Sequence, residues 1–196
     1  MEFSALLLAG GSSKRMGKDK ALILDPFGDP LWKRQWKLLT RLDPHTVFIA
    51  ARDKPEWLPE TSVWVQDANE ASGPIAGIVA ALRACETSHL ICSGLDLVNM
   101  TPTFLKTQMD QCGSDKGIVV KGDRGWEPLS AILPLQVLPL FEKTINQGTF
   151  KLQDVLDTAE QQEWIRSFSV TAKDAPLFRN LNTLSDIEQW KNEVSE

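Results

Sequence analysis

The sequence predicts an α/β fold built on a mostly parallel sheet with helices on both faces. Short apolar runs alternate with stretches of helical periodicity along the 196 residues. Strands that alternate with helices of about 10–15 residues are typical of βαβ units. No internal repeat, low-complexity tract or linker divides the chain, so we expect residues 1–196 to form a single domain.

In the first half of the chain, an apolar run at residues 3–9 stops at Gly10-Gly11 and predicts a buried strand that leads into a loop. Asp29-Pro30 supplies an N-cap and a first-turn proline for a helix that continues to residue 42. The other elements expected here are strands at 46–51, 63–66 and 90–93 and a helix at 75–85.

In the second half, Thr101-Pro102 predicts the start of a capped helix that reaches residue 109. The remaining expectations are strands at 117–121, 129–133 and 164–170 and helices at 135–145 and 185–194. In open parallel sheets, ligands bind at the carboxyl ends of the strands. We therefore expect functional residues in the loops that follow the strands.

The composition excludes several classes of function. A formal net charge of −5 leaves no dense basic face for nucleic acid or for an anionic membrane surface. Cys85, Cys92 and Cys112 fit no zinc spacing, and their odd number argues against a secreted disulfide framework. The apolar run at residues 3–9 is too short to span a membrane. We expect a cytoplasmic protein that binds neither nucleic acid nor membrane.

The loop after the first strand combines glycine with positive charge. Gly10, Gly11 and Gly17 let the backbone bring its N–H groups close to phosphate oxygens. The hydroxyl and cationic side chains of this loop are Ser12, Ser13, Lys14, Arg15, Lys18 and Lys20. Their spacing fits neither a P-loop nor a dinucleotide fingerprint. A nucleoside triphosphate is the expected ligand, and a solvated surface turn is the alternative.

The same loop resembles that of a known family. The residues Ala9-Gly10-Gly11-x-Ser13-x-Arg15-Met16-Gly17-x-Asp19-Lys20 match the signature of the MobA-like NTP transferases. The resemblance implies a Rossmann-like three-layer domain that transfers a nucleoside monophosphate to a phosphorylated acceptor. It implies catalytic contacts to the phosphates from Arg15 and Lys20. It also implies a nucleotide-binding set made of Leu8, Ala9, Gly10, Gly11, Ser12, Gly17 and Lys20.

Two later motifs extend the resemblance. Asp67 and Gly73-Pro74 are similar to the family's elements that border the base and ribose, so they are expected to bind the nucleotide. Asp96 follows the strand at 90–93, where a carboxylate suits Mg²⁺, which prefers one or two protein carboxylates together with phosphate oxygens. The resemblance makes Asp96 a metal-binding, nucleotide-binding and catalytic residue. The alternative is a solvated or capping aspartate.

Near the C-terminus, Asn180-x-Asn182-Thr183 followed by Asp186 is similar to another motif of the family. The resemblance implies that Asn182 approaches the acceptor or the metal, and we expect it to bind the acceptor. The equally weighted alternative is that the Asn-Thr pair caps the final helix.

The chain departs from the family pattern at three places. Leu97-Val98 follow Asp96 where the family usually has a proline, which puts the shape of the metal edge in question. Asp29 stands where a lysine commonly precedes Pro-Leu, which weakens the positive rim around the acceptor. Leu184 replaces a motif proline, a change that we interpret as structural.

The resemblance implies transfer of GMP from GTP to molybdopterin with Mg²⁺ as cofactor, release of pyrophosphate and formation of the molybdopterin guanine dinucleotide cofactor. GTP or another NTP and molybdopterin are then the small-molecule substrates, and proteins of the molybdenum-cofactor pathway are the expected partners. Three alternatives stay open. They are a CTP-dependent molybdenum cofactor cytidylyltransferase, a nucleotidyltransferase that acts on sugar or polyol phosphates, and a non-catalytic nucleotide-binding relative.

Overall fold

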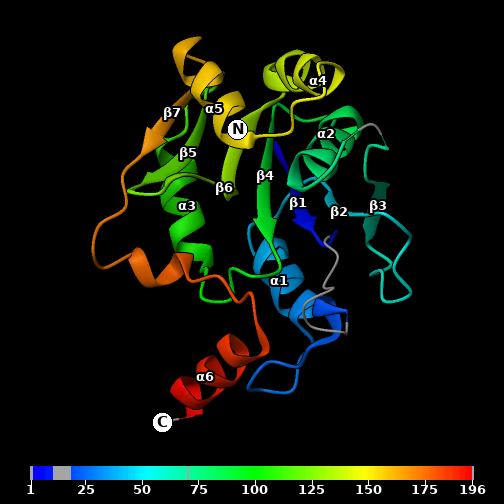
Figure 1. The fold of residues 1–196 in the computed structure, drawn as a ribbon, viewed down its shortest axis with the longest axis vertical. Coiled ribbons are helices and arrows are strands. Elements are labelled where there is room, and N and C mark those ends of the chain that lie inside the picture. Colours follow the sequence, from blue (N-terminus) through cyan, green and yellow to red (C-terminus); the bar gives the residue numbers. More distant parts are fainter. Residues whose placement is uncertain (1, 11–18, 70, 196) are drawn as a thin grey trace.

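The centre of the molecule is one mixed β-sheet. The computed structural model describes residues 2–10, 19–69 and 71–195, and within these ranges seven strands pair in the order β3-β2-β1-β4-β6-β5-β7 (Figure 1). Strand β6 is antiparallel to both of its neighbours, whereas the other paired strands are parallel. The strands are β1 (Phe3–Leu8), β2 (Val47–Ala51), β3 (Ser62–Gln66), β4 (His89–Gly94), β5 (Gly117–Gly122), β6 (Gly125–Pro134) and β7 (Ile165–Phe168).

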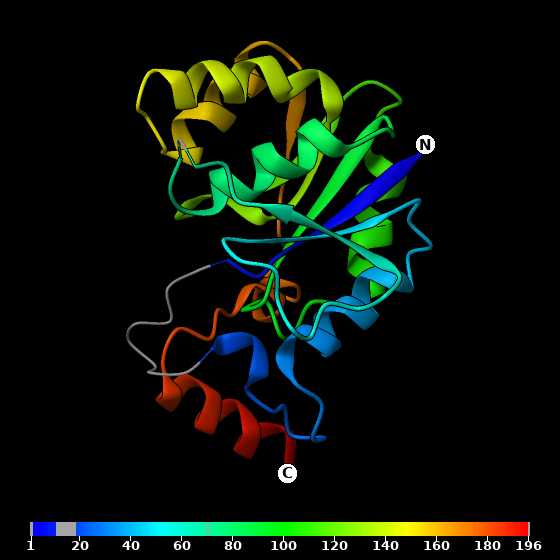
Figure 2. The same ribbon diagram turned by 90° about the vertical axis from the view of Figure 1, so that its right-hand side faces the viewer.

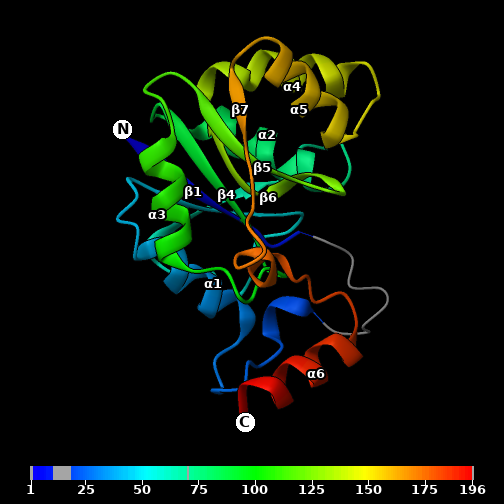
Figure 3. The same cartoon turned by 90° about the vertical axis from the view of Figure 1, so that its left-hand side faces the viewer.

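Helices cover both faces of this sheet. The α-helices are α1 (Leu31–Thr40), α2 (Pro74–Ala84), α3 (Pro102–Gln111), α4 (Leu138–Asn146), α5 (Leu152–Gln161) and α6 (Leu184–Ser195). Short 3-10 helices lie at η1 (Lys20–Leu22), η2 (Leu135–Val137) and η3 (Ala175–Phe178). Helices α2, α4 and α5 pack in one core and α1 and α3 in the other (Figure 3). None of the helices in the described ranges is long and apolar enough to cross a membrane.

A third, smaller core joins the C-terminal helix to the rest of the molecule. Figure 2 shows α6, in red, away from the sheet and beside the blue segment around η1. Leu31, Val98 and Trp190 meet there, together with Leu181 and Ile187. All five side chains are at most 4% exposed. The cluster therefore holds α6 against the start of α1, at Leu31, and against the turn after β4, at Val98.

The predicted α/β class with a mostly parallel sheet and three layers is confirmed. Helix α5 was not predicted, although Leu152, Val155, Leu156 and Ala159 form a buried stripe at helical spacing. The N-cap prediction for α1 was wrong. The N-cap is Pro30, without a side-chain cap, because the Asp29 carboxylate pairs instead with Lys33 and Lys37 at 2.7 and 2.6 Å.

Candidate active site

A lysine and an aspartate meet at the carboxyl edge of the sheet. Asp96 follows β4, and Lys20 is the first residue of η1. The Nζ of Lys20 lies 3.7 Å from Oδ2 of Asp96, and the two side chains are only 17% and 18% exposed. Burial lowers the pKa of Lys20, and the charges of Asp96 and Asp186 oppose that shift. The structure therefore brings together two of the three residues predicted to be catalytic.

The turn after Asp96 is held from helix α1. Leu97 and Val98 are fully buried. The side-chain amide of Gln35 donates to the Leu97 carbonyl and Nε of Arg34 donates to the Val98 carbonyl, both at 3.0 Å. Leu97 and Val98 stand where the family usually has a proline. Their buried side chains and the two hydrogen bonds from α1 hold the turn after Asp96 in place.

A glycine makes room for the Asp96 carboxylate. A Cβ placed on Gly94 would lie 2.5 Å from Oδ1 of Asp96 and 3.0 Å from Cδ1 of Leu129. Both distances are shorter than ordinary carbon contacts, so a side chain at this position forces the carboxylate to move. The last residue of β4 thus determines where Asp96 lies.

Asp67 occupies a narrow space between two glycines. A Cβ on Gly10 would lie 2.6 Å from its Oδ2, and a Cβ on Gly77 would lie 3.2 Å from its Oδ1. Burial raises the pKa of Asp67, and the positive charge of Arg52 opposes the rise. Gly73 has a φ of 76° and precedes Pro74, the first residue of α2, so the predicted Gly-Pro pair begins this helix. Asp67 and Gly10, both predicted to bind the nucleotide, are in contact.

The start of the predicted phosphate loop continues the sheet. The N–H groups of Ala9 and Gly10 both donate to the Ala50 carbonyl at 2.9 Å. Leu8 is buried at the end of β1. The N–H group of Gly10, which was expected to face phosphate, is therefore already used within the sheet. The other predicted loop residues, Gly11, Ser12, Arg15 and Gly17, lie outside the described residues.

Asn182 stands at the beginning of α6. The Asp186 carboxylate accepts hydrogen bonds from the backbone N–H groups of Asn182 and Thr183, at 2.8 and 2.7 Å. The Thr183 hydroxyl accepts one from the Asp186 N–H at 3.1 Å, which completes a capping box. These backbone N–H groups hold the pKa of Asp186 below its usual value. The cap uses the backbone of Asn182, while its side chain is exposed.

Sequence reasoning gave no role to Glu127, Arg52 or the side chain of Asn180. Glu127 is partly buried near the start of β6. Burial raises its pKa, Arg124 opposes the rise and Asp96 adds to it. The one available sequence signal was that Glu127 and Pro128 directly precede the apolar run at 129–133, which predicted a strand. Arg52 directly follows β2, which is a position where ligand-binding residues are expected.

The donor atoms beside Asp96 suit a hard cation. The Leu181 N–H donates to the Asp96 carbonyl at 3.3 Å, so Asn180 is adjacent to the aspartate. The Oδ1 atom of Asn180 is buried and has no hydrogen-bond partner in the described part of the molecule. Among the described residues, no group of three or more His, Cys, Asp or Glu is arranged so that it could hold a metal ion. One carboxylate with an amide oxygen matches Mg²⁺, which takes further ligands from phosphates and water.

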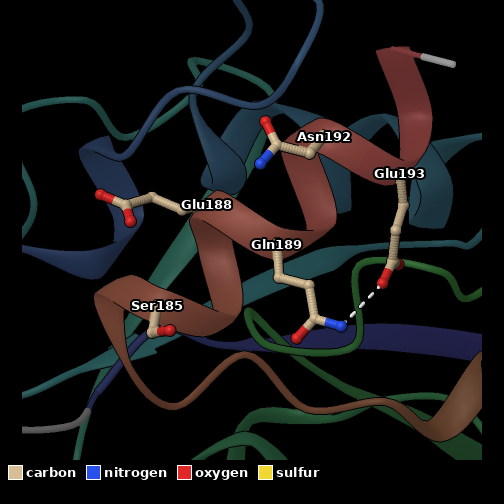
Figure 4. Close-up of a pocket in the computed structure, with 5 residues that line it drawn as sticks. All are labelled: Ser185, Glu188, Gln189, Asn192 and Glu193. Carbon is tan, nitrogen blue, oxygen red and sulfur yellow. Dashed lines mark hydrogen bonds between the residues drawn. The ribbon is translucent and has the colours of Figure 1, made fainter.

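An open depression on α6 is separate from this set. It is lined by Ser185, Glu188, Gln189, Asn192 and Glu193 (Figure 4). The Gln189 amide donates to the Glu193 carboxylate at 3.0 Å across it. All five residues belong to one helix, and none was predicted to be functional. The candidate site is therefore the sheet edge with Lys20, Asp67 and Asp96.

Comparisons with known sequences agree on one family. The family described as MobA-like NTP transferase domain matches residues 5–177. A molybdenum cofactor guanylyltransferase of Pseudomonas fluorescens is 31% identical over 184 residues, which cover 92% of this chain and 89% of the relative. A probable molybdenum cofactor guanylyltransferase of Opitutus terrae is 28% identical over 183 residues, with coverages of 92% and 90%.

Solved structures share the fold. The molybdopterin-guanine dinucleotide biosynthesis protein A of Archaeoglobus fulgidus has a TM-score of 0.74 at 23% identity, over 98% of both chains. A nucleotidyl transferase from Methanothermobacter has a TM-score of 0.77 at 14% identity, over 98% of this chain and 97% of its own. At these identities the likeness concerns the architecture alone.

Proposed function

Because this chain belongs to the MobA-like NTP transferase domain family, we propose that it transfers GMP from GTP to molybdopterin, releases pyrophosphate and forms molybdopterin guanine dinucleotide. The guanine base and the molybdopterin acceptor in this proposal are taken from the names of the relatives, which are molybdenum cofactor guanylyltransferases. The observation that carries the proposal is the partly buried pair of Lys20 and Asp96 at the sheet edge.

Nucleotidyl transfer depends on positioning and on charge neutralisation, because the acceptor's phosphate oxygen attacks the α-phosphorus without a protein nucleophile. Lys20 is placed to offset the negative charge that develops on the departing pyrophosphate. Its ammonium group is largely shielded from water, so its electrostatic effect is stronger than that of an exposed lysine. The resemblance gives Arg15 the same role.

We assign the metal to Asp96 and propose that it is Mg²⁺. The Asp96 carboxylate would hold it, and the buried Oδ1 of Asn180 is a second oxygen donor on the adjacent segment. When bound, Mg²⁺ supplies positive charge that stabilises the phosphate oxygens in the transition state. Gly94 and the two hydrogen bonds from α1 keep the carboxylate and its turn in place for this contact.

The nucleotide side of the site lies at the ends of β1, β2 and β3. Asp67, Gly10, Gly73 and Pro74 border the base and ribose in this proposal. Since the N–H groups of Ala9 and Gly10 donate to Ala50, phosphate contacts come from residues after Gly10 and from Lys20. On the acceptor side, the exposed side chain of Asn182 contacts molybdopterin, while Thr183 and Asp186 cap α6.

The cellular setting is part of the proposal. The cysteines Cys85, Cys92 and Cys112 are free thiols, as expected for the cytoplasm. Burial raises the pKa of Cys112 to about 11, so its thiol stays protonated at neutral pH. Proteins of the molybdenum-cofactor pathway would deliver the acceptor or receive the product.

Pyrophosphate release from GTP, CTP, ATP and UTP tests the function, with molybdopterin present or absent and with Mg²⁺ or EDTA. We expect release from GTP that requires both molybdopterin and Mg²⁺. Preference for CTP would make the protein a cytidylyltransferase. Release that requires a sugar or polyol phosphate would change the acceptor. Binding without turnover for every nucleotide would identify a non-catalytic relative.

A further inference from the structure

We propose that Glu127 recognises the acceptor by accepting hydrogen bonds from the N–H edge of its pterin ring. This inference rests on the proposed function and specifies the acceptor side of the same site. Glu127 is partly buried near the start of β6, at the sheet edge that carries Asp96.

The strand order separates the two substrates. Strands β3, β2 and β1 lie on one side of β4, and β6 lies on the other. Gly10 and Asp67 follow β1 and β3, so they stand on the first side of Asp96. Because β6 is antiparallel to β4, with Ser93 opposite Ser130, its early residues extend past the carboxyl end of β4. Asp67 and Glu127 therefore flank Asp96 from opposite sides.

In-line transfer requires the acceptor and the leaving pyrophosphate to lie on opposite sides of the α-phosphorus, which matches the placement of Asp67 and Glu127 on opposite sides of Asp96. The attacking oxygen approaches the α-phosphorus from the side opposite the leaving pyrophosphate. In the proposed arrangement, Gly10 and Asp67 border the nucleotide and Lys20 binds its leaving phosphates. The acceptor then approaches from the β6 side, where Glu127 is the carboxylate beside Asp96.

The pairing between β5 and β6 shifts register beside this part of β6. Val119 pairs with Ala131 and Lys121 with Trp126, so one residue of β5 between these pairs corresponds to four residues of β6, 127–130. Glu127, Pro128 and Leu129 lie in the extra length. Bulges redirect side chains and are frequent beside active sites. Leu129 lies in this irregular stretch, and a Cβ on Gly94 would lie 3.0 Å from Cδ1 of Leu129 and 2.5 Å from Oδ1 of Asp96, so this part of β6 is close to the aspartate.

The Glu127 carboxylate is available to a ligand. It accepts no hydrogen bond from the described part of the chain, although it interacts electrostatically with Arg124 and Asp96. A pterin presents a ring N–H and a 2-amino group side by side on its pyrimidinone edge. An ionised carboxylate accepts two such hydrogen bonds in parallel, and this pairing is both strong and directional. Glu127 thus has the chemistry to select a pterin and to orient its phosphate.

Calorimetry tests this inference without turnover. Wild-type protein is titrated with 6-hydroxymethylpterin and with 6-hydroxymethyllumazine, in which an oxygen replaces the 2-amino group. We expect the wild type to bind the pterin about 10- to 100-fold more tightly, because a hydrogen bond to a charged group is worth that range. Glu127→Gln should bind the two compounds with similar affinity. Equal wild-type affinities, or full discrimination in Glu127→Gln, would overturn the inference.

Kinetics provide the second readout. Glu127→Gln should raise the KM for molybdopterin about 10- to 100-fold and change the KM for Mg·GTP by less than about twofold. Glu127→Asp should be intermediate, and it replaces the amide variant if that one fails to fold. Glu163→Gln is the matched control, because Glu163 is 82% exposed and pairs with Lys116. An equal rise in both KM values would assign Glu127 to the nucleotide or metal and contradict the inference.

The two proposals fail differently. A wild-type enzyme without guanylyl transfer contradicts the proposed function, and the pterin titration still decides whether Glu127 binds a pterin. A wild-type enzyme that transfers GMP, together with an unchanged Glu127→Gln variant, contradicts the acceptor contact alone.

Discussion

The Nζ atom of Lys20 and the Oδ2 atom of Asp96 lie 3.7 Å apart, and each side chain is less than one-fifth exposed. The two residues come from distant parts of the sequence, η1 and the turn after β4. Removing either partner leaves the other charge in a poorly solvated place, which is costly unless a ligand compensates for it. The same ion pair therefore contributes to the structure of the sheet edge and supplies the two charged groups that the proposed reaction uses.

Loss of either member of this pair should abolish most of the activity. Lys20→Met and Asp96→Asn are each expected to lower kcat about 100-fold or more, because electrostatic contacts made in the transition state have effects of that size. Pyrophosphate release measures this. Lys116→Met is the control, since Lys116 forms an exposed ion pair with Glu163 at 3.3 Å. Near-normal turnover in Asp96→Asn would remove the metal assignment.

Gly94→Ala should impair catalysis by displacing a carboxylate. The new Cβ would lie 2.5 Å from Oδ1 of Asp96, and the flexible end of that side chain has to move. We expect kcat to fall about 100-fold, as misplacement by about 1 Å can do. Gly113→Ala is the matched control, because its Cβ would have no neighbour closer than 3.4 Å. Equal kinetics for the two alanine variants would contradict the positioning role.

Asp67→Asn should weaken nucleotide binding without loss of stability. The folded state raises the pKa of Asp67 mainly by burial, so it binds that proton more tightly than the unfolded chain does. The free energy of unfolding therefore falls as pH rises from the unfolded pKa through the folded one, and the loss is complete above the folded pKa. The amide removes this loss. Thermal unfolding at neutral pH should give an unchanged or higher Tm, while GTP titration should show lower affinity.

The exposed Asp110→Asn provides the control for this measurement. A marked drop in Tm for Asp67→Asn alone would show that its carboxylate stabilises the fold, against the account given above.

Two variants distinguish the interpretation of Asn182 as an acceptor contact from its interpretation as part of the helix cap. Thr183→Ala removes the hydroxyl that accepts the Asp186 N–H, so it should cost about 1 kcal/mol of stability. For a chain of this size that lowers Tm by about 2–4 °C. Asn182→Ala should leave Tm unchanged and raise the KM for molybdopterin. The acceptor contact would be refuted by an unchanged KM for Asn182→Ala.

Acid should destabilise the fold through His89. This residue is fully buried in β4, where its ring contacts Ser88 and the Lys116 carbonyl. Burial lowers its pKa, so the unfolded chain binds the proton more tightly. Stability from neutral His89 is present above the unfolded pKa of about 6.5 and is lost as pH falls through it toward the folded value. Denaturant unfolding across this range should show the loss in the wild type.

The loss should persist in His45→Gln, since His45 is exposed, and should shrink in His89→Gln. An undiminished pH dependence in His89→Gln would assign the acid sensitivity to other groups.

Much of the fold could be predicted because the strands are continuous apolar runs. The run at residues 3–9 became β1 and the run at 46–51 became β2, since both are buried on two faces. The direction of β6 was harder to predict. Its apolar run resembles that of a parallel strand, and only the short hairpin turn between Gly122 and Gly125 reverses it. Helix α5 was missed because a narrow apolar stripe is mixed with polar residues.

Some residues of the candidate site could be predicted from the sequence, whereas others are placed only by tertiary packing. The glycine-rich loop and Asp96 were singled out from residue types and from the family resemblance. The family match confirms the resemblance, while the roles of these residues stay predictions. The contact of Asp67 with Gly10 could not be predicted, because it depends on how α2 and the sheet edge meet. The donations from Arg34 and Gln35 are likewise set by tertiary packing of α1. Glu127 was missed because its place beside Asp96 depends on the pairing of β6 with β4 and on the irregular register with β5, which have no clear sequence signature.

The fate of the α-phosphate of GTP tests the central claim most directly. The protein is incubated with Mg²⁺, molybdopterin and GTP radiolabelled at the α-phosphate, and the products are separated. Transfer of GMP predicts that the label is recovered in a molybdopterin dinucleotide with the wild type, and that Asp96→Asn yields almost none. Label that stays in GTP, or that appears only as free GMP, would contradict the account.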